Sequence, residues 1–503
     1  MYMQGLLFSD FETEDMAEWK VEEFSAAGCY PQDERAKLEE RYADITEMTN
    51  KFSRKSVSYQ LSKNDCLHSW LKYKEGFSSE LVRLLLKEFD LQKGDLVLDP
   101  FMGSGTTALT SIICGFNSAG FDILPMSAIS IKAKTSVFEY DTEELDAMAQ
   151  EVISLCVPQD YEKVTPEISI TRDGYPKETS REIAFYKEHF SRSRYSKNAK
   201  TLLELCTLNS LEKVSYSAKD GQYLRWDWHC PKIVAAAKER ERAGKKPFVV
   251  RLDKGKLPSL KEVLSGELER VIGDVKLLQK SSTEGFKARC NFCEGSALFE
   301  LPKMEGSSVA AVISSPPYCN RYDYTRTYAL ELAYLGVGEE EIKSLRQELL
   351  SCTVENKPKT ERLKRLYREI GRESDFCGTL EIIQSNAVLK EIERALKGRC
   401  ENGEINNNGV LKMVSGYFLE LAFVFAELYR VCKRGAHVAF VNDNVRYAGE
   451  IIPVDYLTTE LARQIGFTPV KIYTLRQLKG NSSQQMKRYG RVALRKSITV
   501  WKK

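Results

Sequence analysis

The stretch Asp99-Pro100-Phe101-Met102-Gly103-Ser104-Gly105-Thr106-Thr107 decides how the rest of this chain is interpreted. Before it, the mostly apolar segment 94–98 predicts a short strand, and after it residues 108–113 predict the start of a buried helix. A glycine-rich turn between a strand and a helix lets a ligand approach bare backbone, because glycine has no Cβ. The helix N-terminus behind it offers free N–H groups to acceptor atoms. The stretch therefore predicts a ligand-binding turn, with a tight packing turn as the alternative.

A second stretch, Ser314-Ser315-Pro316-Pro317-Tyr318, follows the apolar residues 309–313, which also predict a strand. With these two stretches the chain resembles the DNA amino-methyltransferases, whose signature motifs are Asp-Pro-Phe-x-Gly-Ser-Gly-Thr-Thr and [Asn/Asp/Ser]-Pro-Pro-Tyr. That family methylates the exocyclic amine of cytosine (N4) or adenine (N6) with S-adenosylmethionine. The resemblance covers residues 60–125, 285–335 and 413–503.

The resemblance implies a doubly wound, Rossmann-like α/β methyltransferase sheet of seven strands with a reversed last strand. Two long segments interrupt the α/β rhythm and predict an inserted target-recognition lobe and a helical insertion. The predicted division is a helical N-terminal arm (1–55), the cofactor half of the methyltransferase domain (56–145), an inserted DNA-recognition lobe (146–284), the catalytic strand (285–338), a charged helical insertion (339–412) and the C-terminal half of the methyltransferase domain (413–503).

The resemblance also implies which residues hold S-adenosylmethionine. In the glycine turn these are Asp99, Pro100, Phe101, Gly103, Ser104, Gly105, Thr106 and Thr107. A segment just before the turn closes over the methionine end of the cofactor in that family, and Phe77 and Ser79 are the candidates here, with a plain core position as the alternative for Phe77. Ser296 stands where the family commonly has an acid facing the adenine edge, so the backbone could supply that contact.

Asp122 ends the next predicted strand, residues 118–122. A carboxylate at that place can accept two hydrogen bonds from ribose hydroxyls. An acid at a strand end is also often a helix cap, which is the alternative. With the glycine turn upstream, the ribose contact is favoured.

The chemistry of an exocyclic amine explains the catalytic motif. Such an amine is a poor nucleophile, so the base must leave the duplex, acceptors must hold the amine hydrogens, and the methyl group must lie in line. Ser315 Oγ and the Pro316 carbonyl are the predicted acceptors, and Pro316 and Pro317 stiffen the backbone. Tyr318 offers a face for base stacking worth about 1–3 kcal/mol. A surface Pro-Pro turn with an incidental tyrosine is the alternative.

Serine before Pro-Pro-Tyr favours cytosine N4 in the resembled family, and adenine N6 is the alternative. No Pro-Cys dipeptide occurs in the sequence, which argues against methylation of cytosine carbon-5. An RNA or protein-amide methyltransferase, or a catalytically silent DNA-binding relic, are more distant alternatives. Double-stranded DNA is the expected partner, with a cognate restriction endonuclease or defence-system proteins as further candidates.

Composition sets broad limits. The 503 residues are 43% hydrophobic and 29% charged, typical of a soluble globular protein, and no run of about 18 apolar residues predicts a membrane span. No signal-peptide pattern is present, and 13 scattered cysteines fit free thiols, which together predict a cytoplasmic protein. Cys290 and Cys293 have zinc-ligand spacing but no second pair, so a strand is favoured there and no metal is expected. The net charge of +3 means that DNA contacts must come from local basic patches.

Such patches occur in the 146–284 segment, which mixes basic and aromatic residues, although a solvated helical face is the alternative, especially for the last of them. They are residues 189–197, 223–229 and 238–246. Arg321 and Arg326 could hold phosphates beside a flipped nucleotide. The polar segment 480–486 is predicted as a loop over the target base, as in the resembled family.

Overall fold

A central sheet of eight strands organises the molecule, in the order β1-β11-β12-β8-β7-β2-β3-β6. The computed structural model describes residues 19–220, 223–246, 250–281, 285–405, 407–475, 489–490 and 492–503. Neighbouring strands are parallel except β12, which is antiparallel to both β8 and β11. The strands are β1 (Thr46–Met48), β2 (Leu96–Asp99), β3 (Asn117–Asp122), β6 (Cys290–Glu294), β7 (Val309–Ser314), β8 (Cys432–Asp443), β11 (Thr468–Leu475) and β12 (Lys496–Lys502).

The predicted doubly wound α/β sheet with a reversed last strand is confirmed, with one difference. The N-terminal arm supplies β1, which pairs in parallel with β11 and makes eight strands instead of seven. Its backbone covers hydrogen-bonding groups that would otherwise lie open along the edge of the sheet. A three-residue strand has too little alternation to be visible in the sequence.

The chain changes direction across the sheet between β2 and β7. From β2 it proceeds outward through β3 to β6, then returns to β7 on the other side of β2 and continues to β8. The two strands pair in parallel, with Leu98 opposite Val312, so their carboxyl ends lie together. In open α/β sheets, ligands bind at such a switch point.

Helices cover both faces of the sheet, as its almost fully buried strands require. On one face Val97, Ala311 and Ile313 pack against α2 (Ser79–Glu88). On the other, Leu98, Val312 and Phe440 belong to the cluster formed with three helices. These are α10 (Ala297–Glu300), α17 (Gly409–Val431) and α18 (Val454–Ile465).

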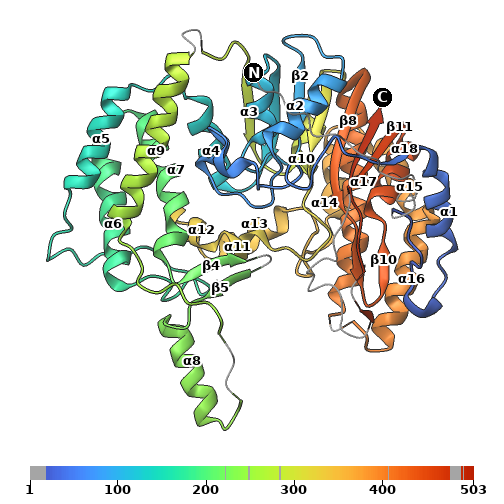
Figure 1. Cartoon of the computed structure of the whole chain (residues 1–503). Coiled ribbons are helices and arrows are strands. Elements are labelled where there is room, and N and C mark those ends of the chain that lie inside the picture. Colours follow the sequence, from blue (N-terminus) through green and yellow to red (C-terminus); the bar gives the residue numbers. More distant parts are fainter. Residues whose placement is uncertain are drawn as a thin grey trace, which may run out of the picture.

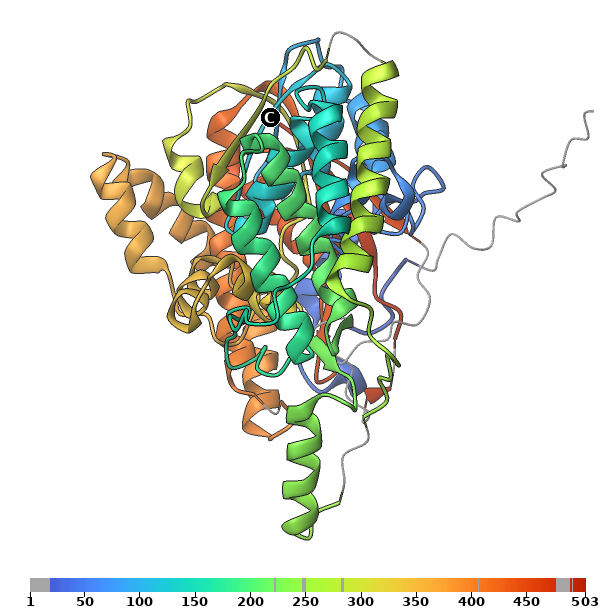
Figure 2. The ribbon, with the colours of Figure 1, turned by 90° about the vertical axis from the view of Figure 1, so that its left-hand side faces the viewer.

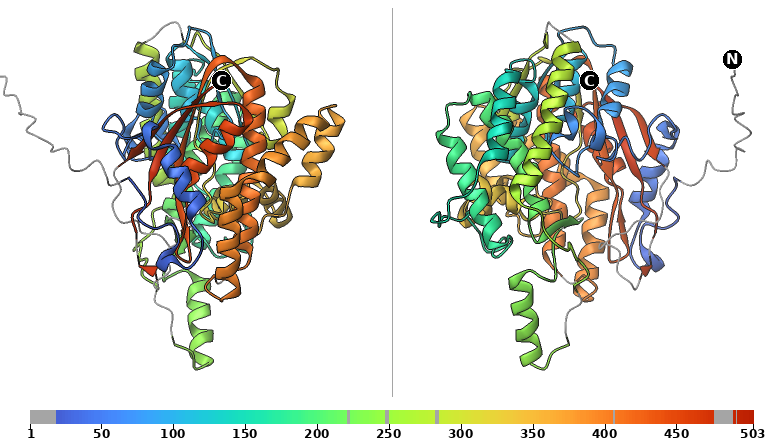
Figure 3. Two further views of the ribbon diagram at one scale, coloured as in Figure 1. Left: turned by 90° about the vertical axis from the view of Figure 1, so that its right-hand side faces the viewer. Right: turned by 60° about the vertical axis from the view of Figure 1, so that its left-hand side comes forward.

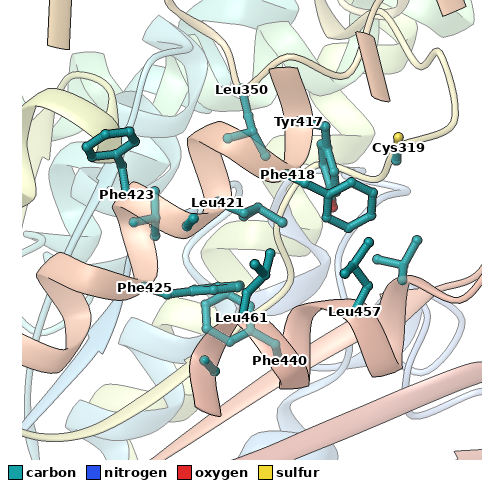
Figure 4. Close-up of a cluster of buried hydrophobic side chains, with 14 of the residues drawn as sticks. Cys319, Leu350, Tyr417, Phe418, Leu421, Phe423, Phe425, Phe440, Leu457 and Leu461 are labelled. Carbon is teal, nitrogen blue, oxygen red and sulfur yellow. The ribbon is translucent and has the colours of Figure 1, made fainter. Parts of the chain in front are cut away.

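Helix α17 is the centre of that second cluster. Figure 4 shows Phe425 of α17 beside Phe440 of β8 and Leu461 of α18, and the Phe425 and Phe440 ring centroids are 5.4 Å apart. Within the described part of the chain, α17 is the one helix that is long and apolar enough to cross a membrane by length and composition. Because its apolar side chains are buried between the sheet and neighbouring helices, the core accounts for that composition.

A helical lobe lies beside the sheet, on the left of Figure 1. It packs on α4 (Pro125–Thr135), which follows α3 (Thr106–Ile113) and β3, and on α12 (Ala329–Leu335), which follows α11 (Tyr324–Thr327). The elements of the lobe are α5 (Thr142–Ser154), α6 (Lys177–Arg192), α7 (Lys197–Val214), β4 (Ser217–Asp220), β5 (Tyr223–Trp226), α8 (Pro231–Arg242) and α9 (Leu260–Ser281).

The charged segment after α12 forms four helices, α13 (Glu339–Glu348), α14 (Thr360–Glu369), α15 (Glu373–Ser385) and α16 (Ala387–Glu401). The first of them, α13, lies beside α11 in Figure 1, while orange ribbons of the later ones stand out on the left of Figure 2. Helix α1 (Asp33–Arg41) of the N-terminal arm packs on α16, as the left panel of Figure 3 shows. The small ribbon of β9 (Val445–Tyr447) and β10 (Glu450–Ile452) contacts α16 as well.

A buried ion-pair cluster joins these three parts. Glu450 of β10 accepts from Arg35 of α1 at 3.1 Å and from Arg399 of α16 at 2.8 Å. Arg35 also pairs with Glu391 of α16 at 2.9 Å. All four side chains are at most 2% exposed.

Candidate active site

The two motif stretches lie side by side at the switch point, and hydrogen bonds connect them. The Asp99 carboxylate at the end of β2 accepts from Ser314 Oγ at the end of β7, at 2.6 Å, and from the Phe101 N–H at 3.0 Å. Thr107 Oγ1 donates to the Ile313 carbonyl at 3.1 Å. Burial raises the pKa of Asp99 to about 6, although these hydrogen bonds act to lower it. Ser314 is thus part of the site although the sequence did not single it out.

The turn after Asp99 needs both of its glycines. Gly103 and Gly105 have φ angles of +52° and +85°. A Cβ on Gly103 would lie 2.8 Å from the Tyr73 ring, and one on Gly105 would lie 2.7 Å from the Ile131 side chain. The close approach of ring and backbone leaves no room for another residue at either position.

Asp122 performs the structural task of a cap and also faces the site. Its carboxylate accepts from the Gly103 N–H at 2.8 Å, the Leu124 N–H at 2.9 Å and Ser127 Oγ at 2.9 Å. Burial raises the pKa of Asp122, while these donors act to lower it. A carboxylate has about four acceptor sites, so a further hydrogen bond to a ligand remains available.

A cleft opens above the turn. Aromatic rings and the carboxylates of Glu75, Asp99 and Asp122 line it together with bare backbone, a combination that suits a ligand with an aromatic base and positive charge. Among the predicted residues, the lining includes Phe77, Asp99, Pro100, Phe101, Gly103, Ser104, Thr106, Asp122, Ser296, Ser315 and Pro317.

The segment before the turn contributes differently from the prediction. Phe77 lines the cleft, but Ser79 is not in its lining, and the Ser79 hydroxyl donates to Asp65 at 2.5 Å. Ser78 caps α2 by accepting from the Leu81 N–H at 3.4 Å.

A second pocket meets the first at the Ser-Pro-Pro-Tyr stretch. Glu75, Gly76, Ser315 and Tyr324 line both pockets. The rest of its wall is Val57, Ser58, Lys74, Pro316, Tyr318, Asn320, Tyr322, Asp443 and Lys496. Two ligands bound in the two pockets would therefore face each other across Ser315.

A fixed positive charge lies in the second pocket. Lys496 Nζ is 3.5 Å from the Tyr318 hydroxyl and 3.5 Å from the Asp443 carboxylate, and 5.3 Å from the Tyr318 ring centroid. Burial acts to lower the pKa of Lys496, but Asp443 and Tyr318 raise it above its ordinary value. Ser315 Oγ in turn donates to the Tyr318 hydroxyl at 3.1 Å. Lys496 and Asp443 were missed by sequence reasoning.

Glu75 connects the pockets to the neighbouring helices. Its carboxylate accepts hydrogen bonds from the hydroxyls of Tyr322 and Tyr328. Tyr73 stacks on Tyr328 with ring centroids 5.3 Å apart and an interplanar angle of 9°. The segment between Tyr73 and Phe77 is thereby held against α11 and α12.

The remaining predictions have varied outcomes. Arg326 pairs with Asp323 at 3.2 Å and Glu355 at 2.6 Å, so its charge is already matched within the protein. Arg321 has a positive φ of 66°, an uncommon conformation for a side-chain-bearing residue, beside the second pocket. Cys290 and Cys293 lie on β6, the strand that was predicted there. The predicted loop 480–486 lies outside the described residues.

Fold and pockets together define a Rossmann-like methyltransferase, and comparisons with known proteins agree. The model of a DNA methylase family matches residues 19–132. The Type II methyltransferase M.BsoBI of Geobacillus stearothermophilus is 52% identical over 486 residues, covering 97% of this chain and 95% of that protein. The Type II methyltransferase M.AvaI of Nostoc sp. is 37% identical over 471 residues, covering 93% and 92%.

This chain belongs to the Type II DNA methyltransferases, within the class that methylates cytosine N4 or adenine N6. The methyl donor of that family is S-adenosylmethionine. Its members act on DNA in restriction–modification systems.

Proposed function

We propose that this enzyme methylates N4 of a cytosine flipped out of double-stranded DNA at a specific site. The observation that carries the proposal is the position of Ser315, which lines both the cleft above the glycine turn and the pocket beside Tyr318. A methyl donor in the first and a base in the second would meet there. The chemistry of flipped-base modification requires such a meeting point.

The residues of the first cleft fit S-adenosylmethionine. Its carboxylates Asp99 and Asp122 suit a ligand that carries a sulfonium and an ammonium group, and Phe101 and Phe121 offer faces for an adenine ring. When bound, the cofactor supplies an electrophilic methyl group. We assign Asp122 to the ribose hydroxyls and the Ser296 backbone to the adenine edge. Ser79, whose hydroxyl is occupied by Asp65, would act by starting α2 behind Phe77.

In the second pocket, the side chains would prepare the amine for attack. Ser315 Oγ and the Pro316 carbonyl accept its hydrogens, so that the nitrogen lone pair turns away from the ring and toward the first cleft. Tyr318 stacks on the flipped base. These groups act by orientation, and none of them forms a covalent bond with the base.

Two features support cytosine over adenine. Ser315 precedes Pro-Pro-Tyr, which favours cytosine in the resembled family. Lys496 places a permanent cation in the pocket, and cytosine has two acceptors, N3 and O2, on the edge that carries its amine, whereas adenine has one. An N–H donor at that edge complements cytosine better.

We further propose that the helical lobe within residues 146–284 recognises the target DNA, because an insertion of that size beside the base pocket carries both basic and aromatic side chains. A cognate restriction endonuclease is the proposed partner, by analogy with the Type II relatives. A cytoplasmic location follows from these roles.

The test is methyl transfer from labelled S-adenosylmethionine to mixed bacterial DNA, followed by mass spectrometry of the nucleosides. We expect N4-methylcytosine. N6-methyladenine would overturn the base assignment and leave the two-pocket mechanism in place. Retained cofactor binding without transfer to DNA would instead support RNA, a protein amide or a silent relic.

A further inference from the structure

Helix α8 stands apart from the rest of the molecule. It extends beyond the β4–β5 hairpin into solvent in Figures 1 and 2, and none of its residues is buried. A helix of 12 residues is about 18 Å long, and on its own such a helix is marginal in water. A projecting helix without a packed face points to a binding partner outside the chain.

The root of α8 is firmly fixed, so the helix is a defined projection. Lys232 Nζ donates to the Ile170 carbonyl at 2.7 Å and lies 3.0 Å from the Trp226 ring centroid. Lys232 thus holds the first turn of α8 against the hairpin. In the segment after α8, Lys254 Nζ donates to the carbonyls of Glu212 and Ser215 at the end of α7, each at 2.6 Å.

The far end of α8 concentrates positive charge. Residues 231–246 contain six lysines and arginines and two glutamates, while the whole chain has a net charge of only +3. Lys238, Arg242, Lys245 and Lys246 are exposed, and in the described part of the chain their side chains form no ion pair. Four exposed cations close together suit the phosphates of nucleic acid.

The arm also lies on the correct side of the molecule. Strand β8 ends at Asp443 in the base pocket, and α8 projects downward in Figure 1 from below the β4–β5 hairpin. Lys74 of the pocket wall donates to the Lys219 carbonyl of β4, and the Lys219 ammonium pairs with Glu331 of α12. The hairpin that carries α8 is therefore part of the surroundings of the base pocket.

We infer that α8 and the turn after it form a DNA arm that grips the phosphate backbone of the duplex next to the target base. Lys238, Arg242, Lys245 and Lys246 make the contacts, and they hold the duplex without reading its sequence. The inference rests on double-stranded DNA being the substrate, and it holds for either base.

The experiment compares two variants with four alanine substitutions each. The arm variant carries K238A, R242A, K245A and K246A; the control carries K87A, K93A, R434A and K502A, at exposed sites near the amino ends of the strands, opposite the pockets. Duplex affinity is measured over a range of KCl concentrations, with and without the methylation site. Alanine favours helix, so α8 is expected to stay folded.

Each phosphate contact contributes about 0.9 to the slope of log K against log salt. We expect the arm variant to lose roughly 3–4 from that slope and to bind both duplexes more weakly by similar factors. Cofactor affinity and the turnover rate on saturating DNA should be unchanged, and the control should behave like the parent enzyme.

An unchanged slope in the arm variant would overturn the inference. A loss confined to the duplex with the site would overturn the assignment to phosphates, because it would mean that α8 reads bases. Nucleoside analysis of the same reactions keeps the two proposals apart. A methylated adenine would refute the cytosine assignment while the salt slopes still decide the role of the arm.

Discussion

Two opposite effects act on the pKa of the Asp99 carboxyl group: burial raises it and hydrogen bonds lower it. Burial raises its pKa to about 6 from the ordinary value of 3.8, while Ser314 and the Phe101 N–H stabilise the ionised form. A folded state that binds the proton more tightly than the unfolded chain loses stability as pH rises between those two values. The protein therefore gives up stability, about 3 kcal/mol at most, to keep a carboxylate at the cofactor cleft at neutral pH.

Because the ligand is cationic, cofactor affinity should rise as the pH increases through about 6, by up to tenfold per pH unit below it. In Asp99→Asn the amide oxygen can still accept from Ser314, so the fold is retained but the pH dependence is lost. Calorimetric titration with S-adenosylmethionine between pH 5 and 8 measures this, with Asp95→Asn as the control (Asp95 pairs with Lys433 at the other end of β2). If the cofactor affinity of Asp99→Asn depended on pH in the same way as that of the parent enzyme, the pH dependence could not be assigned to Asp99.

Ser315→Ala removes one acceptor for the amine hydrogens and leaves the cofactor cleft intact. We expect the single-turnover rate of methyl transfer to fall by about 10²–10³-fold, as for the loss of one donor or acceptor in a preorganised site. The cofactor Kd should stay within experimental error. Ser308→Ala, at a surface turn before β7, serves as the control. Weaker cofactor binding with an unchanged rate would mean that Ser315 serves the cofactor and not the amine.

At the scale of elements, the sequence was most informative where periodicity is long. The helix predicted to start over 108–113 is α3, and the strand predicted over 309–313 is β7. The three-residue strands β1, β9 and β10 were not predicted, because so few residues show no period. Their pairing depends on tertiary partners.

The candidate site was predictable as far as its motifs extend. The glycine turn and the Ser315 stretch are each a short continuous motif in the sequence, and residues of both line the pockets. Lys496 was not predictable, because the register of β12 against β8 places it opposite Asp443. Ser79 was expected in the cleft, but at the start of α2 its hydroxyl meets Asp65 instead.

The glycine turn can be tested as an element with two matched alanine substitutions. Gly94 and Gly105 have φ angles of +86° and +85°, but a Cβ on Gly94 meets nothing within 4 Å, whereas one on Gly105 meets Ile131 at 2.7 Å. Gly94→Ala should cost about 1–2 kcal/mol of unfolding free energy from backbone strain alone. Gly105→Ala should cost about 1–3 kcal/mol more and weaken cofactor binding at least tenfold. Equal effects in denaturation and binding would argue against a packed turn.

At the scale of the whole molecule, the buried ion pairs of Glu450 hold the N-terminal arm, α16 and β10 together. Glu450→Gln leaves Arg35 and Arg399 without their shared carboxylate, and breaking such a buried cluster typically costs about 3–5 kcal/mol. We expect a lower denaturation midpoint and faster proteolysis within the arm. Glu340→Gln, whose pair with Lys343 is exposed, should change neither. A wild-type midpoint in Glu450→Gln would show that packing alone holds the arm.

The place of β12 in the sheet has a consequence for the time at which the enzyme becomes active in a cell. This strand lies between β8 and β11, yet it follows both in the chain, and it brings Lys496 to the base pocket. At ribosomal speeds of about 5–20 residues per second, Lys496 emerges roughly 20–80 s after the glycine turn. A nascent chain can thus form its glycine turn early. The pocket beside Tyr318 stays incomplete until β12 has been added between β8 and β11. We therefore expect DNA methylation only from chains in which β12 has been synthesised, and no activity from shorter nascent chains.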